Sequence, residues 1–354
     1  MSQWWCDPVQ ALDTQAQADA QARQQTLTKP AGSLGVLESI VVKLAGMQGQ
    51  VCPTLNTPYI SIFAADHGIA SSGVSAFPQE VTLQMVANFA QGGAAICVLS
   101  RQIGAMFEVV DVGVAGDTSA FIGVVQDKTA QGTHSFLSQA AMTDEQLTHA
   151  LTAGRAAVGR ALSAGADAFI GGEMGIGNTT SASALACLWL NASPVDMTGA
   201  GTGLDTDGIR HKVMLIEQAL DHHHLKRTAT WEVLRTFGGF EIAALAGAYI
   251  AAAQAGLPVI VDGFICSVAA LAASRLQPDV SGWLLFGHVS AEQAHRRVLY
   301  ALEAEPVLQL QMRLGEGSGA ATAWPLLQMA CALHGQMATF ADAAVSTRHL
   351  HDAD

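Results

Sequence analysis

Short apolar segments alternate along the chain with longer segments in which apolar residues recur every three or four positions. The short segments are typical of buried strands, and the longer ones have the spacing of helices. Because parallel strands are usually joined by helical crossovers, this alternation predicts an α/β fold with a parallel sheet flanked by helices. The predicted strands are Tyr59–Ala65, Met106–Val112, Ala168–Gly171, Val195–Thr198, Pro258–Val261 and Trp283–Phe286.

Two of the helices between these strands have clear start signals. Thr143 is followed three residues later by Gln146, and Ser290 is followed by Gln293. Both pairs have the residue types of a capping box, in which the two side chains satisfy backbone N–H groups reciprocally. Gly165 predicts the end of the helix that Thr143 opens.

Two segments look helical but lie outside the alternation. They are the Gln- and Ala-rich segment Val9–Gln25 and the tail Trp324–Asp354. We therefore predict a large α/β catalytic domain over residues 28–323 and a small, discontinuous helical domain that combines residues 1–27 with residues 324–354.

The composition supports a close-packed α/β core and argues against nucleic acid as a partner. Apolar residues make up 50% of the chain and charged residues only 13%. Thirty acidic against 17 basic residues give a formal net charge of −13, and no run of Lys or Arg offers a track for a phosphate backbone. An anionic small substrate would have to be held by helix N-termini, backbone N–H groups and a single placed Lys.

Cysteine usage and hydropathy predict a cytoplasmic protein without a membrane segment. The six cysteines are scattered and form no C-x-x-C pair, which favours a reducing compartment. The N-terminus contains an acid and lacks the basic start of a signal peptide. The apolar stretch Ile242–Ala273 is interrupted at Gly256–Pro258 and at Asp262–Gly263, so each piece is too short to span a bilayer and reads as helix, strand and helix.

Residues that can do chemistry follow the predicted strands directly. In an open parallel sheet, ligands bind outside the carboxyl ends of the strands, so one site is expected along one edge of the sheet. These positions are Asp66–Gly68, Asp111–Gly113, Gly172–Glu173, Gly199–Gly201, Asp262–Gly263 and Gly287–His288.

Three glycine-rich segments are candidates for ligand contact. Gly315–Ala320 places Glu316 between glycines, which lets a ligand approach the backbone closely; the alternative is a turn with a solvated Glu. No Lys follows, so this segment is not a P-loop. Gly171–Thr180 follows a strand and opens a helix, so it can cradle a phosphate, bind a dinucleotide or simply form a tight turn. Thr198–Gly203 is a second such turn, and Lys212 is the nearby cation.

Other conspicuous residues have structural explanations. His67 can be a metal ligand, but no second histidine stands at metal-site spacing, so a strand-end histidine satisfied by backbone groups is favoured. Glu241 opens an apolar helix, where capping of N–H groups is slightly favoured over facing the site. The run His222–His224 is interpreted as a surface feature, because consecutive helical positions point in different directions.

Several of these segments together resemble the nicotinate-nucleotide:dimethylbenzimidazole phosphoribosyltransferase family. The match runs in order from about residue 28 to residue 330, with several long motifs at consistent spacing. The matching segments are Lys29–Glu38, Ala64–Gly68, Gly172–Gly175, Asn178–Thr180, Phe237–Glu241, Val261–Phe264, His288–Glu292 and Arg313–Ala320.

The resemblance implies a homodimer whose subunits each have a parallel sheet of Rossmann-like topology and a small helical domain built from both termini. It places the active site at the carboxyl ends of the strands, with help from the partner subunit. The implied reaction transfers 5-phosphoribosyl from nicotinate mononucleotide to 5,6-dimethylbenzimidazole or a related base, giving α-ribazole 5′-phosphate and nicotinate for cobalamin. Neither a cofactor nor a metal is expected, and the substrates are the implied partners.

By the motif match, Glu316 corresponds to the general base of the family. Some members have polar residues in the base pocket where this chain has Phe77 and Met85, which leaves the ring substituents of the base open. The expected substrate-binding residues are Glu173, Gly175, Asn178, Thr179, Gly201, Gly203, Lys212, Ser290, Leu314, Phe77 and Met85.

Two rival interpretations remain at this point. The closer one is the same transfer onto another aromatic acceptor, such as a purine or a phenol. The more distant one is a non-catalytic nucleotide-binding regulator, which no appended DNA-binding module supports, or a metal hydrolase. The hydrolase would use Asp66, His67, Asp111 and His288.

Overall fold

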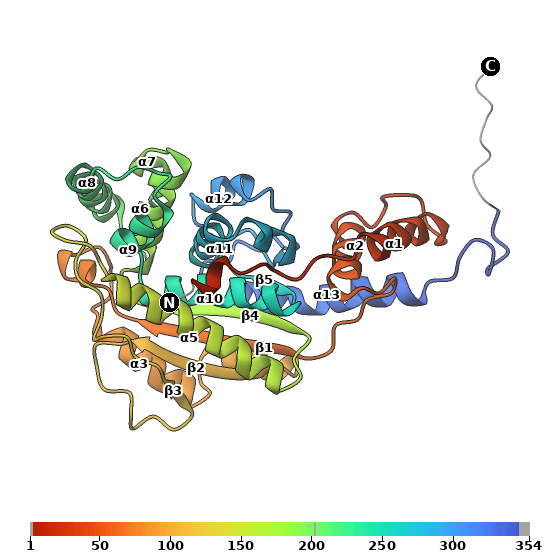
Figure 1. Ribbon diagram of the computed structural model, residues 1–354, viewed down its shortest axis with the longest axis horizontal. Coiled ribbons are helices and arrows are strands. Elements are labelled where there is room, and N and C mark those ends of the chain that lie inside the picture. Colours follow the sequence, from red (N-terminus) through yellow and green to blue (C-terminus); the bar gives the residue numbers. More distant parts are fainter. Residues whose placement is uncertain (1–2, 202, 347–354) are drawn as a thin grey trace, which may run out of the picture. The chain divides into compact units, whose positions relative to one another are not determined.

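The computed structural model describes residues 3–201 and 203–346, which contain one parallel sheet. Its strands are β1 (Pro58–Ala65), β2 (Met106–Gly113), β3 (Val124–Gln126), β4 (Ala168–Met174), β5 (Val259–Val261) and β6 (Leu284–Phe286). They pair in the order β3-β2-β1-β4-β5-β6, which is the order of the Rossmann sheet (Figure 1). The predicted fold class is confirmed.

Five of the six predicted strands are present, and the sixth is a short helix. The prediction for residues 195–198 was wrong because Ser193 and Pro194 start a helix there: the Ser193 hydroxyl accepts from Asp196 N at 3.3 Å, and Pro194 occupies the first turn. Strand β3 was missed, since only Val124 of its three residues is buried and the segment is therefore no continuous buried apolar run.

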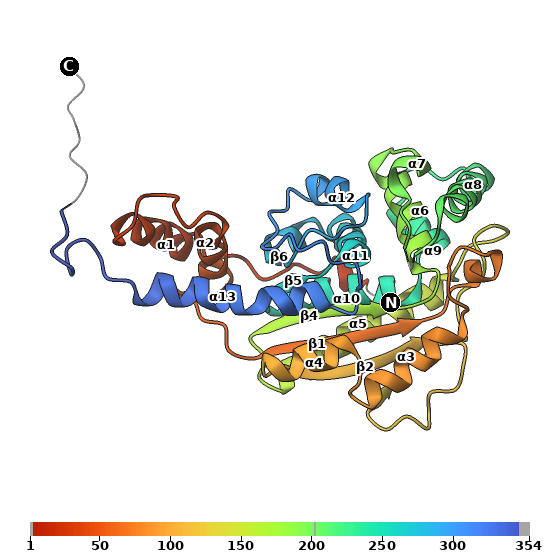
Figure 2. The same cartoon turned by 180° about the vertical axis from the view of Figure 1, so that it is seen from behind.

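The helices cover both faces of the sheet. Figure 1 shows α5 in front of the strands, and the reverse view in Figure 2 brings α3 and α4 to the front. Their bounds are η1 (Trp4–Cys6), α1 (Thr14–Thr26), α2 (Val36–Gln48), η2 (Gly68–Ser72), α3 (Glu80–Ala90), α4 (Ala95–Gln102), α5 (Asp144–Ser163), α6 (Asn178–Leu190), α7 (Pro194–Met197), α8 (Thr206–His223), α9 (Thr230–Phe237), α10 (Phe240–Ala255), α11 (Phe264–Leu276), η3 (Pro278–Trp283), α12 (His295–Ala301) and α13 (Ser318–Gln336).

The predicted start and end signals are present at α5, but the predicted start at Ser290 is not. Thr143 and Gln146 form the expected capping box, and Gly165 follows the end of α5 with φ +79°, as predicted. The signal at Ser290 was wrong, since α12 begins only at His295. The Ser290 N–H donates instead to His295 Nδ1 at 2.8 Å, which ties the segment into a turn.

Glycine allows α5 and α10 to pack with their backbones in contact. A Cβ added at Gly154 of α5 would lie 1.9 Å from the carbonyl oxygen of Ala244, and one at Gly247 of α10 would lie 2.1 Å from that of Leu151. Helix α10 is buried over nearly its whole surface, so these contacts have no room to open. The close packing of α5 on α10 therefore requires glycine at both positions.

Adding a methyl group at this crossing should destabilise the fold. We expect Gly154→Ala to lower the free energy of unfolding by about 3 kcal/mol, because the clash is with backbone that cannot rotate away. The matched control is Gly159→Ala on the same helix, where nothing lies within 4 Å of the added Cβ. That variant should gain about 0.5–1 kcal/mol. Equal stability of the two variants in urea denaturation would contradict the packing argument.

Contacts divide the chain into two compact units. The first contains residues 57–324 and the N-terminal residues up to Gln10, where Trp5 stacks on Trp231 with ring centroids 5.0 Å apart. The second contains residues 11–56 and the described residues from Pro325 onward.

The boundary between the units differs from the predicted one because α2 packs on α1. Within the second unit, Asp13 N donates to Gly46 O at 2.9 Å. Residues 28–56 therefore join the terminal helices, whereas the prediction placed them in the large domain.

Two apolar stretches bear on membrane insertion. Residues 242–273 form α10, β5 and α11, as predicted. Residues 80–102 are long and apolar enough to cross a membrane by length and composition. In the structure that stretch is divided into α3, of 11 residues, and α4, of 8 residues, each shorter than the roughly 20 residues that a spanning helix needs.

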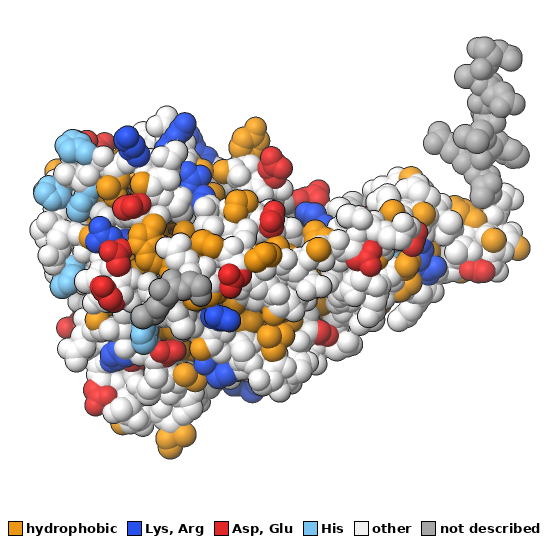
Figure 3. Space-filling view, viewed as in Figure 1, with side chains coloured by type: hydrophobic (Ala, Val, Ile, Leu, Met, Phe, Trp, Pro, Cys, Tyr) orange, Lys and Arg blue, Asp and Glu red, His pale blue; other side chains and the backbone are white. Residues whose placement is uncertain are grey.

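Charged side chains of both signs are mixed on the surface. On the face in Figure 3, Lys and Arg side chains are scattered among Asp and Glu side chains and form no continuous basic track. Several pairs lie within 4 Å, among them Arg210 with Asp207 and Arg297 with Asp196. Nothing on this face resembles the basic stripe of a nucleic-acid-binding protein.

Candidate active site

A cavity of about 430 Å³ lies at the carboxyl ends of β4, β5 and β6. Its walls come from the segments that follow these strands, from α3 and the residues before it, and from residues 313–316. The volume lies within the range of small-molecule sites, about 300–1,000 Å³. The strand-end residues of the sequence thus meet at one edge of the sheet, where a Rossmann-like sheet binds its ligand.

Most of the predicted site residues line this cavity. Lys212 does not line it directly, but its Nζ donates to the Thr179 hydroxyl at 2.7 Å. Gly203 lies in the turn before α8 with φ +114° and is not part of the lining. The predicted residues that line the cavity are Phe77, Met85, Glu173, Gly175, Asn178, Thr179, Gly201, Ser290, Leu314 and Glu316.

Glu316 is presented by three consecutive residues in the left-handed conformation. The φ angles are +85° at Gly315, +61° at Glu316 and +74° at Gly317. Glycine adopts this conformation freely, whereas at Glu316 it costs about 1–2 kcal/mol of conformational free energy. Because the flanking residues are glycines, only Glu316 bears this conformational cost. The glycine at position 315 also allows close approach, since a Cβ there would lie 2.4 Å from Glu173 Oε1. The double-glycine motif is thus required by backbone conformation as well as by close approach.

The environment of Glu316 makes its carboxylate more basic. The side chain is buried, and its Oε2 has no hydrogen-bond partner among residues 3–201 and 203–346. Burial raises the pKa of Glu316, and the nearby charge of Asp262 raises this pKa further against the opposing effect of a backbone hydrogen bond from Ile96. A carboxylate with a raised pKa is a better general base near neutral pH.

Glu173 is the second carboxylate of the cavity, and it differs from Glu316 in its protonation. Burial, together with the charges of Glu241, Asp262 and Glu316, raises the pKa of Glu173 to about 8. Near neutral pH the protonated form of this group is therefore favoured. The Asn178 amide donates to its Oε2, and the remaining proton makes Glu173 a hydrogen-bond donor to a ligand.

The turn from β4 into α6 and the turn before α8 supply the anion-binding features. Residues 175–180 lead into the N-terminus of α6, where backbone N–H groups and the helix dipole favour an anion. Lys212 is only 1% exposed, and burial lowers its pKa to about 8. Arg313, which lines the cavity, donates from Nη1 to Gly201 O at 3.3 Å.

Asp262, His288, Glu292 and Arg313 also line the cavity, although they were not among the predicted substrate-binding residues. Only the alternative metal hydrolase gave a role to His288. Asp262 and His288 had a visible signal, since each follows a strand directly, but strand-end position alone does not reveal which side chains face the cavity.

His67 and Glu241 form a buried pair beside the turn from β4 into α6. Their side chains contact each other at 2.6 Å between Nε2 and Oε1, and His67 Nδ1 lies 3.0 Å from the Ser181 hydroxyl of α6. Capping by Glu241 is not observed, so that expectation was wrong, and His67 is satisfied by side chains rather than by backbone groups. The pair links the end of β1 to α6 and α10.

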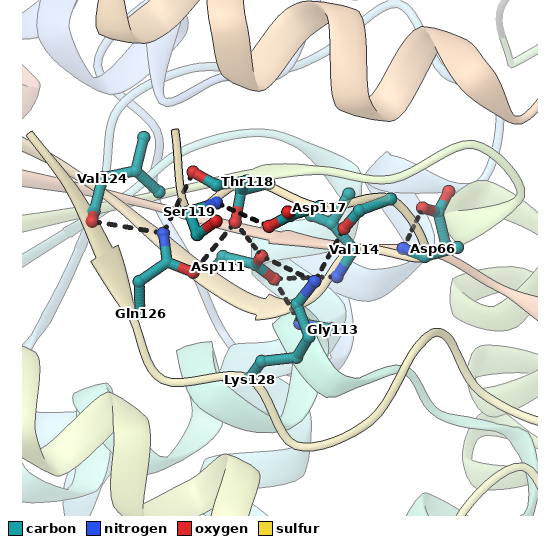
Figure 4. Close-up of polar contacts among 12 residues, drawn as sticks. Asp66, Asp111, Gly113, Val114, Asp117, Thr118, Ser119, Val124, Gln126 and Lys128 are labelled. Atoms are coloured by element: carbon teal, nitrogen blue, oxygen red, sulfur yellow. Dashed lines mark hydrogen bonds and ion pairs between the residues drawn. The ribbon is translucent and has the colours of Figure 1, made fainter. Parts of the chain in front are cut away.

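Asp111 and Asp66 are held by protein donors at the ends of β2 and β1 (Figure 4). Asp111 accepts from the N–H groups of Gly113 and Val114 at 3.0 and 2.8 Å, and Lys128 Nζ lies 3.2 Å from its Oδ2. Asp66 Oδ2 accepts from Ala115 N at 2.8 Å. Within residues 3–201 and 203–346, no group of three or more His, Cys, Asp or Glu is placed to hold a metal ion.

Comparison with known proteins agrees with this geometry. A family model described as phosphoribosyltransferase matches residues 9–345. The chain belongs to the phosphoribosyltransferase family. A protein of Pseudomonas fluorescens (strain SBW25) called nicotinate-nucleotide–dimethylbenzimidazole phosphoribosyltransferase is 57% identical over 345 residues, which cover 98% of both chains. A protein of the same name from Pseudomonas aeruginosa (strain UCBPP-PA14) is 54% identical and covers 98% of this chain and 99% of that one.

Solved structures extend the similarity to the whole fold. The crystal structure of CobT from Thermus thermophilus has a TM-score of 0.91 and 42% identity, and covers 94% of this phosphoribosyltransferase and all of that chain. A second crystal structure from that organism, of an enzyme with the same name as the Pseudomonas relatives, has a TM-score of 0.89 and 41% identity. The family resemblance drawn from the sequence motifs is confirmed.

Proposed function

We propose that this enzyme transfers the 5-phosphoribosyl group of nicotinate mononucleotide to 5,6-dimethylbenzimidazole or a related base, in cobalamin biosynthesis. The products are α-ribazole 5′-phosphate and nicotinate. One observation carries the proposal: a single cavity joins the glycine-rich turn before α6, the buried carboxylate of Glu316 and an apolar wall. The relatives that cover the whole chain carry this activity in their names.

The donor nucleotide is placed by its phosphate. Residues 175–180 and Lys212 hold the 5′-phosphate, because they offer backbone N–H groups and a buried cation in an otherwise acidic chain. Gly201 and Ser290 contact the ribose phosphate, and Gly203 shapes the same turn. Glu173 donates a hydrogen bond to the nucleotide from its protonated carboxyl group. The reacting C1′ then faces the centre of the cavity.

The chemistry is one displacement at C1′. Nicotinate is a cationic pyridinium while it is attached, so it takes the bonding electron pair and leaves as a ring with neutral nitrogen. The imine nitrogen of the benzimidazole attacks from the opposite face with its lone pair. Its other nitrogen then becomes acidic, and Glu316 accepts that proton, a step worth about 10²–10⁴ in rate. Holding the two substrates in line supplies a comparable or larger share.

The apolar wall receives the acceptor base. Phe77 and Met85 line the cavity together with Val81 and Leu314. Phe77 is 51% exposed and Leu314 is 57% exposed, so both present apolar surface for a flat ring to cover. These residues recognise the base by stacking and shape, since they offer no directed hydrogen bonds.

Such a wall should discriminate weakly between methylated bases. We expect benzimidazole, 5-methylbenzimidazole and 5,6-dimethylbenzimidazole to react with kcat/KM values within about two orders of magnitude of one another, because one missing methyl group is worth about 1–3 kcal/mol. Phenol and p-cresol should be much poorer acceptors, since a hydroxyl must lose its proton before it attacks. The measurement is kcat/KM for the five acceptors under one set of conditions, with Phe77→Ser as the comparison variant.

A preference of more than about 10⁴ for the dimethyl compound over benzimidazole would contradict a purely apolar pocket, since methyl burial cannot produce that ratio. Efficient transfer to phenols, by contrast, would support the alternative acceptor class that the sequence left open.

The decisive experiment for the function is incubation of the protein with nicotinate mononucleotide and 5,6-dimethylbenzimidazole, followed by detection of the riboside phosphate by mass spectrometry. The anomeric configuration by NMR should be α, because a single displacement inverts C1′ of a β-nucleotide. Chelators should leave the rate unchanged, since no step uses a metal. Absence of product with the folded protein would refute the proposal.

We also propose that the enzyme acts as a homodimer in the cytoplasm, without nucleic-acid or membrane partners. The scattered cysteines, of which Cys97, Cys187, Cys266 and Cys331 are buried, form no disulfide among the described residues, which suits a reducing compartment. The charge of −13 and the mixed surface disfavour a polyanion. The mass in solution, from light scattering, tests the dimer.

A further inference from the structure

Asp262 stands at the centre of the cavity edge and has no assigned role so far. It follows β5 directly, is 1% exposed and lines the cavity. Its Oδ1 accepts from Ala320 N at 2.9 Å and lies 3.6 Å from His288 Nε2. Its Oδ2 has no hydrogen-bond partner among the described residues.

Three polar atoms around this cavity are buried without a partner in the part of the chain that the structure describes. They are Asp262 Oδ2, Glu316 Oε2 and His288 Nδ1. Buried polar atoms are nearly always hydrogen-bonded, and each exception requires an explanation. Because all three residues line the same cavity, the simplest explanation is that the occupant of the cavity supplies the missing interactions.

The carboxylate of Asp262 is held rigidly and its negative charge is supported. Ala320 lies in the first turn of α13, so the bond to Asp262 uses the positive end of a helix dipole. The ring of His288 is fixed against Gly319, where an added Cβ would lie 2.1 Å from His288 Cδ2. A side chain at position 319 would therefore push the imidazole away from Asp262.

Asp262 and the neighbouring Glu173 differ in their tendency to carry a negative charge near neutral pH. Glu173 has a pKa of about 8 and is already bonded by Asn178, so near neutral pH it brings no negative charge to the ribose. Burial raises the pKa of Asp262 as well, but His288 and backbone N–H groups oppose that rise. A bound pyridinium cation opposes it further, because an opposite charge nearby favours the ionised carboxylate.

We propose that Asp262 is a second catalytic carboxylate, whose free oxygen stabilises the positive charge on C1′ and O4′ of the ribose while the bond to nicotinate breaks, and that His288 positions it. The inference rests on the proposed function. As the C1′–N bond breaks, its electron pair moves to the nicotinate nitrogen and positive charge moves from that ring to the ribose. The lone pair of the acceptor nitrogen removes this charge, and Asp262 itself forms no bond and takes no proton.

Glu316 and Asp262 thus serve different substrates. Glu316 acts on the acceptor by removing its proton, and Asp262 acts on the donor by charge alone, as carboxylates do in glycoside cleavage. The two sites of action can be separated by choosing an acceptor that has no proton to lose.

The primary test is Asp262→Asn, which keeps the shape and the acceptor for Ala320 N but removes the charge. Preorganised charge stabilisation of this kind is typically worth about 10²–10³ in kcat, so we expect a loss of that size with 5,6-dimethylbenzimidazole. The dissociation constant of nicotinate mononucleotide, measured by calorimetry, should change by less than about tenfold, because the interaction strengthens only in the transition state. His288→Gln should lower kcat by about tenfold, since it removes the support and not the charge.

The second arm uses 1,5,6-trimethylbenzimidazole, which attacks through its free nitrogen and yields a cationic riboside without releasing a proton. With this acceptor, Glu316→Gln should change kcat by less than about threefold, whereas Asp262→Asn should still lose about 10²–10³. Asp127→Asn is the matched control, because Asp127 follows β3 and pairs with His149 outside the cavity. It should retain wild-type activity.

Two outcomes would overturn the inference while leaving the proposed function intact. One is an Asp262→Asn variant that turns over 5,6-dimethylbenzimidazole within about threefold of wild type. The other is a loss that appears only as weaker donor binding with normal kcat. If Asp262→Asn does not fold, Asp262→Glu decides, because a displaced charge should lower kcat by more than about tenfold with donor binding retained, and normal kcat refutes the inference. A wild-type protein without product would refute the function instead.

Discussion

Replacing Glu316 with Gln should lower turnover with 5,6-dimethylbenzimidazole by about 10²–10⁴-fold while the protein remains folded. Gln has nearly the same shape as Glu and can adopt the same left-handed backbone, but it cannot accept the acceptor proton. In the proposed mechanism, the raised pKa of the Glu316 carboxyl, due to burial and to Asp262, makes it a more effective base. The measurement is kcat at saturating concentrations of both substrates.

Donor binding is the control for this variant. Nicotinate mononucleotide should bind Glu316→Gln about as tightly as wild type, because the proton is removed from the other substrate. Turnover close to that of wild type would show that another group accepts the proton. Glu173 and Asp262 are the alternatives, since both carboxyl groups line the cavity.

Removing Lys212 should weaken donor binding by about 10–100-fold, seen as a higher KM for nicotinate mononucleotide with little change in kcat. A hydrogen bond from a charged group contributes about 1.5–3 kcal/mol. Because the phosphate does not change during the reaction, ground-state binding and transition-state binding should weaken by the same amount. Lys212→Ala removes both the charge and the bond to Thr179. Steady-state kinetics with varied donor concentration measures the effect, and a fall in kcat alone would contradict the assignment.

The same residue predicts a pH dependence of kcat/KM for the donor. Burial lowers the pKa of Lys212 from 10.5 to about 8, so the cation that binds phosphate is lost as the pH rises through about 8. Donor binding should therefore weaken on the alkaline side. Glu173 titrates in the same range, which makes the comparison with Lys212→Ala necessary. In that variant the part of the alkaline decline due to Lys212 should be absent.

Much of the sheet could be predicted because buried parallel strands are continuous apolar runs. Strand β1, buried at every position, is the clearest case. Strand β3 could not be found in this way, since it ends on an exposed Gln126 and only Val124 is buried, whereas the equally short β5 and β6 are buried at every position. Residues 195–198 do not form a strand despite their β-type composition, because Ser193 and Pro194 start a helix there.

The site was predictable where backbone conformation leaves a mark on the sequence. Glu316 was recognisable because its left-handed turn requires glycine on both sides. Asp262 and His288 carry no such mark, since their importance depends on side chains that meet across β5, β6 and α13. The boundary near Asn56 was missed for a similar reason: α2 joins the terminal helices through packing, which composition does not reveal.

At position 316, folding stability and the proposed activity favour different residues. Glycine at this position would relieve the left-handed conformation and remove a buried oxygen that has no partner among the described residues, so the folded state would gain about 1 kcal/mol or more. In a lineage that obtained its cobamide from outside, nothing would oppose that gain. Replacement of the proposed base by glycine would then leave an intact, slightly more stable protein without the reaction.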